Sequence, residues 1–414
     1  MNGDTDRFTA RTPAAEPARP TELVLEVGAP AHGGACVAHA PDGRVVFVRH
    51  ALPGEQVRAI VTRHRKRLLW ADAVQVLVAS PDRVSPPCPW AGPGLCGGCD
   101  LQHASLAAQR SWKAGVVREQ LQRLAGIDLP VRVQGLPEVG GGEGEGLGWR
   151  TRVSYAVDAA GRAGLRAHQS HEVIPVDRCR IAHPAITQLD VPGRTWRGSV
   201  AVDVVVDSSG RTRLTRHRSR GAPVVQGPGA LTERSGGRQF RVTGFWQVHP
   251  AAADVLTGAV LALLAPKPGE RALDLYAGVG VFAAALAAAG TSVIAVESGH
   301  RAASDAVFNT ASLGVEVWEG EVAQAVAADQ RPELHPIHLI VLDPPRAGAG
   351  REVVESLVAM QPRAVAYVAC DPAALARDVA TFVARGWRLA ALRAFDCFPM
   401  THHVECVALL EPDR

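Results

Sequence analysis

The C-terminal part of the chain alternates strand-like and helix-like segments, and this alternation constrains the fold more than any other feature of the sequence. The pattern begins near Ala251 and holds almost to the end. Strands connected by helices in this way form a parallel, doubly wound sheet, so we expect an α/β domain of the Rossmann-like kind. The expected strands cover residues 271–276, 292–297, 315–318, 338–343, 364–370, 389–395 and 403–410.

Three features of this region indicate a cofactor site. Gly278 and Gly280 lie where the first strand turns into its helix, and glycines there let a ligand approach the backbone at the helix N-terminus. Glu297 ends the second strand, about twenty residues later, where a carboxylate can bind a ribose diol. Asp343 ends the fourth strand and is followed by two prolines. Each feature alone is often only a turn or a cap, but their order favours an adenosine-containing cofactor.

The rest of the chain divides into shorter regions. Residues 1–20 read as a flexible tail, and residues 21–80 read as short strands of a small barrel of the OB type. Residues 81–250 form a central region with a helical pattern near 106–124 and a Gly-rich connector at 139–148. Strand signals at 151–158, 172–176 and 200–206 make this region mainly β. Residues 251–414 complete the α/β domain.

Charge and hydropathy limit the classes of protein to which this chain can belong. Residues 151–240 contain 14 Lys and Arg against 7 Asp and Glu, whereas residues 241–414 contain 13 against 19. The excess includes Arg211, Arg213, Arg216, Arg218 and Arg220, and a second basic cluster covers residues 63–67. Such clusters favour contact with nucleic acid, although Arg-rich composition and a solvated surface remain open as the alternative. Without a secretory signal or an apolar run of about 20 residues, the expected location is the cytoplasm.

Cys370 and Glu405 are candidates for a catalytic pair. Cys370 ends the fifth expected strand and so lies at the ligand-binding edge of the sheet, and Glu405 lies near the start of the last strand. Alone, each could be a buried structural residue. Together they suit methylation of carbon 5 of uracil, in which a thiolate adds to carbon 6 and a carboxylate later removes the carbon 5 proton. Because a free thiol has a pKa of about 8.5, the site is expected to help ionise it.

Several separated stretches resemble the RNA uracil-5 methyltransferase family of the TrmA and RlmD type. They are CPWAGPGLCGGCDLQH at 88–103, GWRTR at 148–152, FWQVHP at 245–250, DLYAGVG at 274–280, LDPPRAG at 342–348, ACDPAALARD at 369–378 and FPMTHHVE at 398–405. The resemblance implies a class I methyltransferase domain, an N-terminal TRAM domain and a central RNA-facing domain. It also implies that Asp371 and Met400 stand where many members have Asn and His.

The resemblance implies roles for individual residues. Cys370 would be the nucleophile and Glu405 the base. S-adenosylmethionine would be bound by Gln247, Tyr276, Gly278, Gly280, Glu297, Glu321 and Asp343, with the match at Glu321 the loosest. The implied partner is RNA, ribosomal rather than transfer RNA, and we expect a monomer that needs no membrane.

The eight cysteines include a close triad, Cys88, Cys96 and Cys99, with Cys179 in the next region. In a cytosolic protein this spacing favours a metal over disulfides, and four thiolates suit zinc or an iron–sulfur cluster equally well by number. The resemblance favours a 4Fe-4S cluster with a structural or RNA-positioning role.

Two other functions fit part of the sequence. The first is an RNA methyltransferase of another specificity, such as an amino-methyltransferase, which would not need the thiol of Cys370. The second is a non-catalytic iron–sulfur RNA-binding protein, against which the glycine loop, Glu297, Cys370 and Glu405 argue.

Overall fold

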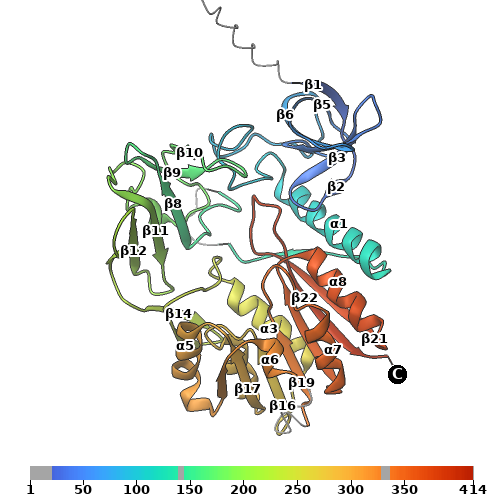
Figure 1. The fold of residues 1–414 in the computed structure, drawn as a ribbon, viewed down its shortest axis with the longest axis vertical. Helices are drawn as coiled ribbons and strands as arrows, with labels where there is room; N and C mark the ends of the chain where they lie inside the picture. Colours follow the sequence, from blue (N-terminus) through green and yellow to red (C-terminus); the bar gives the residue numbers. More distant parts are fainter. Residues whose placement is uncertain (1–20, 139–143, 328–335, 414) are drawn as a thin grey trace, which may run out of the picture.

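The computed structural model describes residues 21–138, 144–327 and 336–413, which form three β-rich parts, with the long helix α1 (Leu106–Ala125) packed between the N-terminal and C-terminal parts (Figure 1). The expected tail at 1–20 and the first half of the expected connector, 139–143, lie outside the described residues. Within the described ranges, none of the helices is long and apolar enough to cross a membrane.

The N-terminal part is a six-stranded sheet with the strand order β1-β5-β6-β4-β3-β2. Its strands are β1 (Glu22–Glu26), β2 (Pro30–Ala31), β3 (Ala35–His39), β4 (Val45–Arg49), β5 (Gln56–His64) and β6 (Leu68–Val78). The expected barrel is not closed, since no ladder joins β1 to β2 in the described chain. Instead, two backbone bonds between Val37 and the residues 28–29 hold the chain after β1 beside β3. Since β2 follows β1 closely in the chain, the segment 22–31 pairs with β5 at its start and with β3 at its end.

The central part is mainly β, as expected, but richer in strands than the sequence indicated. Its sheet has the order β10-β9-β8-β11-β12-β13, and β14 and β15 form a separate hairpin. The elements are α1 (Leu106–Ala125), β7 (Val133–Gly135), β8 (Arg152–Val157), β9 (Ala163–Arg166), β10 (Val173–Ile174), α2 (Pro184–Thr187), β11 (Ser199–Val206), β12 (Thr212–Arg218), β13 (Val224–Gln226), β14 (Leu231–Ser235) and β15 (Arg238–Val242). Most of the arginine-rich run lies on β12, where Leu214 is the one fully buried residue. The alternation of apolar and polar residues in β12 is therefore too weak to predict a strand from the sequence.

The C-terminal part is the expected doubly wound α/β domain. Its elements are α3 (Ala252–Leu264), β16 (Arg271–Leu275), α4 (Val281–Ala288), β17 (Ser292–Glu297), α5 (His300–Thr310), a 3₁₀ turn (Ala311–Leu313), β18 (Glu316–Glu319), α6 (Val322–Ala325), β19 (Leu339–Leu342), α7 (Arg351–Ala359), β20 (Ala364–Ala369), α8 (Pro372–Val383), β21 (Trp387–Asp396) and β22 (Glu405–Pro412). The sheet order is β18-β17-β16-β19-β20-β22-β21-β7, so β7 of the central part adds the last strand. Strands β16 to β20 run parallel, and β22 is antiparallel to both of its neighbours.

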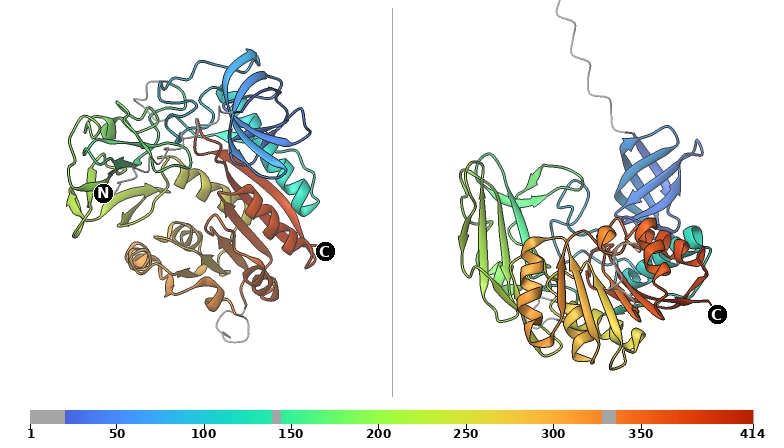
Figure 2. Two further views of the ribbon diagram at one scale, coloured as in Figure 1. Left: turned by 45° about the horizontal axis from the view of Figure 1, so that its top comes forward. Right: turned by 60° about the horizontal axis from the view of Figure 1, so that its bottom comes forward.

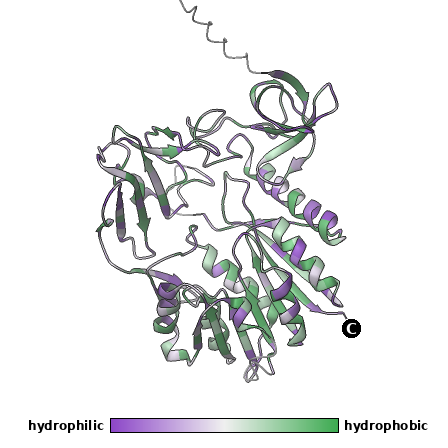
Figure 3. Cartoon of the chain, in the orientation of Figure 1, coloured by the Kyte–Doolittle hydropathy of each residue, from purple (hydrophilic) through white to green (hydrophobic). Residues whose placement is uncertain are grey.

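Two apolar cores cover the two faces of this sheet. Helices α1, α7 and α8 contribute to one core, and helices α3 and α4 contribute to the other. The strands β19 and β20 are apolar along their whole length, because both of their faces are buried (Figures 2 and 3). The strand order reverses at β16, which has β17 on one side and β19 on the other. Ligands of such sheets bind at this reversal, outside the carboxyl ends of the strands.

Candidate active site

Three predicted cofactor residues lie side by side at the reversal of strand order. Leu275 on β16 pairs with Val296 on β17 and with Leu342 on β19. The residues that follow these three are Tyr276, Glu297 and Asp343, so the sheet register brings them to one edge. The expected order of features along the chain is thus also an arrangement in space.

The glycine loop is tied to the acidic end of β17. One carboxylate oxygen of Glu297 accepts a hydrogen bond from the Gly278 amide at 2.8 Å, and the other accepts one from the Gly299 amide at 2.6 Å. Tyr276 has φ of 63°, which is costly for a residue with a side chain. Gly280, at φ of 85°, has Thr310 Cγ2 only 3.1 Å from where a Cβ would lie. The loop is therefore fixed before any ligand binds, and each Glu297 oxygen keeps a second lone pair for a ribose.

Two carboxyl groups near the glycine loop, those of Asp274 and Asp343, have raised pKa values. Burial raises the pKa of Asp343 to about 7 and that of Asp274 to about 8. One Asp274 oxygen accepts a hydrogen bond from the Ala283 amide at 2.7 Å. The other Asp274 oxygen is buried without a partner in the described structure. At neutral pH Asp274 is mostly protonated, which reduces the cost of burying it.

The positions of the other two predicted cofactor residues, Gln247 and Glu321, follow from contacts of their neighbours and from electrostatics. Trp246 packs in one apolar cluster with Val279 of the glycine loop, and this brings the neighbouring Gln247 to the same side of the domain. Glu321 is exposed and precedes α6. Its charge is one cause of the raised pKa of the Tyr276 hydroxyl, so the two residues are close.

Cys370 and Glu405 are brought together by the pairing of β20 with β22. Ala369 lies opposite Cys406 in this antiparallel pair, and one step further in each strand are Cys370 and Glu405. Cys370 is half-buried, whereas Glu405 is only 4% exposed. The structure therefore places the two expected reacting groups next to each other, 35 positions apart in the chain.

Electrostatics at this pair differ from expectation. Burial, together with the charges of Glu405 and Asp343, raises the pKa of Cys370 to about 11, and the charge of Arg346 and a backbone hydrogen bond at Cys370 oppose the shift. Burial and Asp343 also raise the pKa of Glu405 well above its usual value. In the free protein the surroundings therefore raise the pKa of the thiol instead of lowering it, because burial disfavours the charged thiolate.

The two departures from the family pattern have structural explanations. Asp371 is the N-cap of α8, where its Oδ1 accepts a hydrogen bond from the Ala374 amide at 2.8 Å, and Asn caps helices equally well. Met400 is buried in the apolar core of the central part, with φ of 69° and an amide that donates to Gln109 Oε1 at 2.7 Å. Met400 therefore shapes the loop before β22 from within the core.

A small cavity of about 110 Å³ lies over Cys370, and its lining includes residues that the sequence does not single out as part of the site. Arg346, His403 and His32 line it together with Cys370 and Asp371. Arg346 and His403 belong to the stretches LDPPRAG and FPMTHHVE, so their motifs were the available signal. No pattern near His32 linked the N-terminal sheet to this cavity.

The four cysteines of the predicted metal site meet at a different cavity. Cys88, Cys96, Cys99 and Cys179 all line a hollow of about 660 Å³ between the segment 88–102 and the central sheet. Burial raises the pKa of Cys99, with further contributions from the charges of the other three sulfurs, so the four are near one another. Within the described residues, however, no three His, Cys, Asp or Glu side chains are close enough to hold one metal ion.

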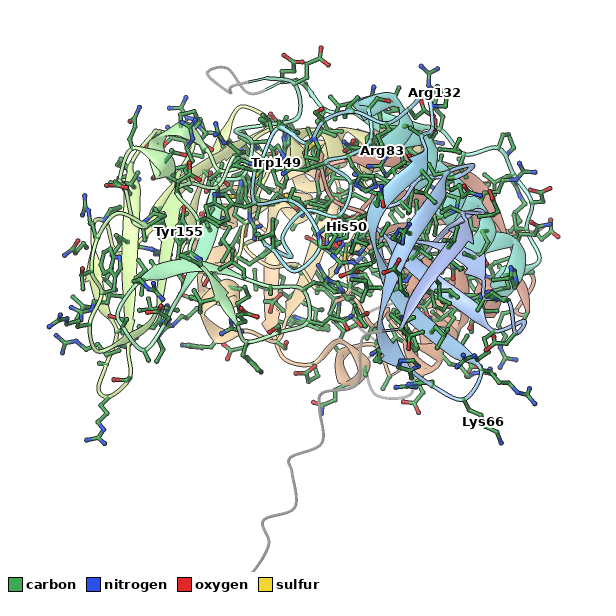
Figure 4. All side chains as sticks on the ribbon, turned by 90° about the horizontal axis from the view of Figure 1, so that it is seen from above. His50, Lys66, Arg83, Arg132, Trp149 and Tyr155 are labelled. Carbon is green, nitrogen blue, oxygen red and sulfur yellow. The ribbon has the colours of Figure 1, made fainter. Side chains whose placement is uncertain are left out.

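Two basic surfaces can be compared as contacts for nucleic acid. On the β5–β6 hairpin, residues 63–67 are all exposed, and the Arg63 guanidinium lies 3.6 Å above the Trp70 ring. Lys66 extends away from the body of the molecule (Figure 4). The arginines within β12 are less available, since Arg213 donates to the Gly229 carbonyl oxygen and Arg216 donates to Ser199. Arg218 and Arg220 stay exposed.

Comparison with known proteins decides the family. The profile of the tRNA (uracil-5-)-methyltransferase family matches residues 245–413, and the TRAM domain profile matches residues 21–74. An uncharacterized RNA methyltransferase of Streptomyces avermitilis is 47% identical over 94% of this chain and 98% of its own length. The 23S rRNA (uracil(1939)-C(5))-methyltransferase RlmD of Halomonas elongata is 36% identical over 95% and 90%. The chain belongs to the RNA uracil-5 methyltransferase family.

A solved structure agrees with this assignment at the level of the fold. The Pyrococcus abyssi tRNA (uracil-54, C5)-methyltransferase, in complex with S-adenosyl-L-homocysteine, superimposes with a TM-score of 0.71. It covers 93% of this chain and 100% of its own length at 21% identity. The methyltransferase thus combines a class I catalytic domain with an N-terminal TRAM domain, as the resemblance implied.

Proposed function

We propose that this methyltransferase methylates carbon 5 of a uridine in ribosomal RNA, with S-adenosylmethionine as methyl donor and a covalent Cys370–uracil adduct as intermediate. The observation that carries the proposal is the adjacency of Cys370 and Glu405 at the ends of β20 and β22. A nucleophile and a base at one edge of the cofactor-binding sheet are what methylation of a pyrimidine carbon requires.

The order of bond changes follows from the uracil ring. Carbon 5 is a poor nucleophile until the Cys370 sulfur bonds to carbon 6 and turns the ring into an enolate. After carbon 5 has gained the methyl group, it still carries its original hydrogen. Glu405 removes that proton, the electron pair restores the double bond between carbons 5 and 6, and the bond from carbon 6 to Cys370 breaks. The thiolate is thereby regenerated.

Burial makes both reacting groups hold their protons more tightly. Because the pKa of both groups is raised, two protons must leave for solvent before the reaction: that of Cys370, so that the thiolate can attack, and that of Glu405, so that the carboxylate can later take the proton of carbon 5. Arg346 is the charged neighbour that favours the thiolate. Burial keeps Glu405 basic enough to take a proton from carbon once it is ionised.

The residues at the β16 reversal suit the methyl donor. S-adenosylmethionine supplies the methyl group as a sulfonium. Glu297 would bind the ribose hydroxyls, and the amides of the glycine loop face the same edge together with Tyr276 and Asp343. Gln247 and Glu321 would complete the pocket from the two sides.

The cysteine cavity supports an iron–sulfur cluster as a second resident group. Cys88, Cys96, Cys99 and Cys179 are the proposed ligands of a 4Fe-4S cluster, since all four line one cavity and four thiolates are the usual ligand set of such a cluster. The cluster would tie the segment 88–99 to the central sheet. Gly97 fits this tight segment, because a Cβ there would lie 2.5 Å from His168.

Two kinds of RNA compete as substrate. Relatives named 23S rRNA methyltransferases share more than 30% identity across nearly the whole chain, whereas the tRNA enzyme is related at 21%. This favours ribosomal RNA, and cytoplasmic action would follow.

The decisive test maps 5-methyluridine in total RNA from cells with and without the gene, and repeats it with Cys370→Ala. We expect one ribosomal uridine to lose its methyl group in both mutant strains. A modification that persists with Cys370→Ala would rule out the thiol mechanism and favour another methyltransferase chemistry. A lost methyl group on transfer RNA would keep the chemistry and correct the substrate.

A further inference from the structure

The TRAM domain reaches the cavity above the proposed nucleophile. The tip of its β2–β3 hairpin contributes His32 and Gly33 to the same cavity of about 110 Å³ that Cys370 lines. These residues are more than 330 positions from Cys370 in the chain. The module expected to bind RNA thus also forms part of the catalytic cavity.

A direct contact joins the two domains there. His32 Nε2 lies 3.1 Å from Asp371 Oδ2, and the His32 side chain is 38% exposed while that of Asp371 is 22% exposed. The second oxygen of Asp371 caps α8 through the Ala374 amide. Asp371 therefore connects the hairpin tip, the start of α8 and the residue next to Cys370.

Close contacts with Asp100 and His402 hold the hairpin tip in place. Gly34 is buried at φ of 81°, and a Cβ on it would lie 3.0 Å from Asp100 Cβ and 3.1 Å from His402 Nδ1. Asp100 in turn contacts His402 at 2.5 Å and Arg49 of β4 at 3.5 Å. Only glycine permits this approach, so the sequence of the hairpin is suited to holding His32 over the cavity.

We propose that His32 is a positioning residue for the target base: the hairpin tip forms the outer wall of the uracil pocket, and the His32–Asp371 contact fixes this wall beside Cys370. The inference rests on the proposed function and extends it. A base that is to react must leave its stack and be held against the thiol, and such a pocket needs a wall opposite the nucleophile. The contact couples RNA binding by the TRAM domain to base placement.

The test separates base placement from RNA affinity. The probe is 23S rRNA transcribed in vitro with 5-fluorouridine, whose fluorine cannot be removed as a proton and therefore traps the adduct with Cys370. The measured quantities are the rate of adduct formation at saturating RNA and the dissociation constant of the RNA. The variants are His32→Ala, His32→Gln, which keeps a hydrogen-bond donor, and the control His39→Ala, an exposed histidine of β3 that does not line the cavity.

We expect His32→Ala to slow adduct formation by about tenfold or more while the dissociation constant changes by less than about twofold. His32→Gln should recover much of the rate, and His39→Ala should behave like the wild type. Slowing of less than about threefold, or a loss confined to RNA affinity, would overturn the inference. If the wild type itself forms no adduct while Cys370→Ala still methylates RNA, the proposed function fails instead.

Discussion

Cys370 and Glu405 occupy matching positions one step beyond the Ala369–Cys406 pair that closes the ladder between β20 and β22. Their proximity is set by backbone register, so it does not depend on a flexible loop. The two side chains also influence each other, because the charge of Glu405 contributes to the raised pKa of the Cys370 thiol. Two predictions follow from this relationship.

Replacing Glu405 by Gln should stop the reaction after methyl transfer. The amide cannot take the carbon 5 proton, so the bond between Cys370 and carbon 6 should persist. We expect turnover to fall by about 10²-fold or more, the usual effect of losing a general base. A labelled protein–RNA band should accumulate on denaturing gels, and the double variant with Cys370→Ala should lack it. Near-normal turnover of Glu405→Gln would show that another group removes the proton.

The reactivity of Cys370 should depend on pH in a way that its neighbours control. Because its pKa is raised to about 11, alkylation by iodoacetamide should still accelerate above pH 10 in the free enzyme. Glu405→Gln removes a negative charge and should move the midpoint to lower pH, whereas Arg346→Ala removes a positive charge and should move it higher. Mass spectrometry of the Cys370 peptide measures the rate. Equal midpoints in all three proteins would contradict this electrostatic account.

A buried ion pair should support the loop that leads to Glu405. Lys113 of α1 and Asp396 at the end of β21 are 0% and 1% exposed, and Lys113 Nζ lies 2.5 Å from the carboxylate and 3.1 Å from the Phe398 carbonyl oxygen. Lys113→Met leaves Asp396 buried and unpaired, which typically costs about 3–5 kcal/mol in the free energy of unfolding. Urea denaturation measures the loss. The double variant Lys113→Met/Asp396→Leu should recover most of it, and failure to recover would assign the cost to packing.

The fold of the catalytic domain was predictable because its signals are local. Strands buried on both faces are continuous apolar runs, and the seven expected strands match β16 to β22 within two residues at either end. The N-terminal and central sheets were harder to predict. Strand β12 carries arginines that bond to neighbours within the domain, so its sequence resembles a charged surface. The pairing of the segment 22–31 with β5 at its start and β3 at its end is set by tertiary structure, which no periodicity reveals.

At the site, the sequence predicted which residues matter but not what surrounds them. Motifs marked Cys370 and Glu405, whereas their raised pKa values arise from burial and mutual charge, which depend on the packing of the whole domain. The contact of His32 with Asp371 is likewise a product of tertiary structure. A helix cap at Asp371 can be predicted from the sequence, but the contact of its other carboxylate oxygen with His32 cannot.

The β5–β6 hairpin should provide sequence-independent affinity for RNA. Arg65 and Lys66 are exposed at its tip. Replacing both by Ala should weaken binding and reduce the slope of log affinity against log salt by about 1.5, since each phosphate contact contributes about 0.7–0.9. Filter binding at several salt concentrations measures the slope. Arg44→Ala, in which an arginine already paired with Asp42 is removed, is the matched control and should leave the slope unchanged. An unchanged slope in the double variant would exclude this hairpin from the RNA contact.

The cysteine cavity makes a prediction about metal content that is independent of activity. If Cys88, Cys96, Cys99 and Cys179 hold a 4Fe-4S cluster, protein purified without oxygen should contain about four iron and four sulfide ions per chain. Cys179→Ser should remove the cluster and lower the thermal midpoint, because the segment 88–99 would lose its link to the central sheet. Cys36→Ala is the control, since Cys36 is buried in the TRAM domain, where its thiol donates to the Ala51 carbonyl. One zinc ion per chain, with no iron or sulfide, would contradict the cluster.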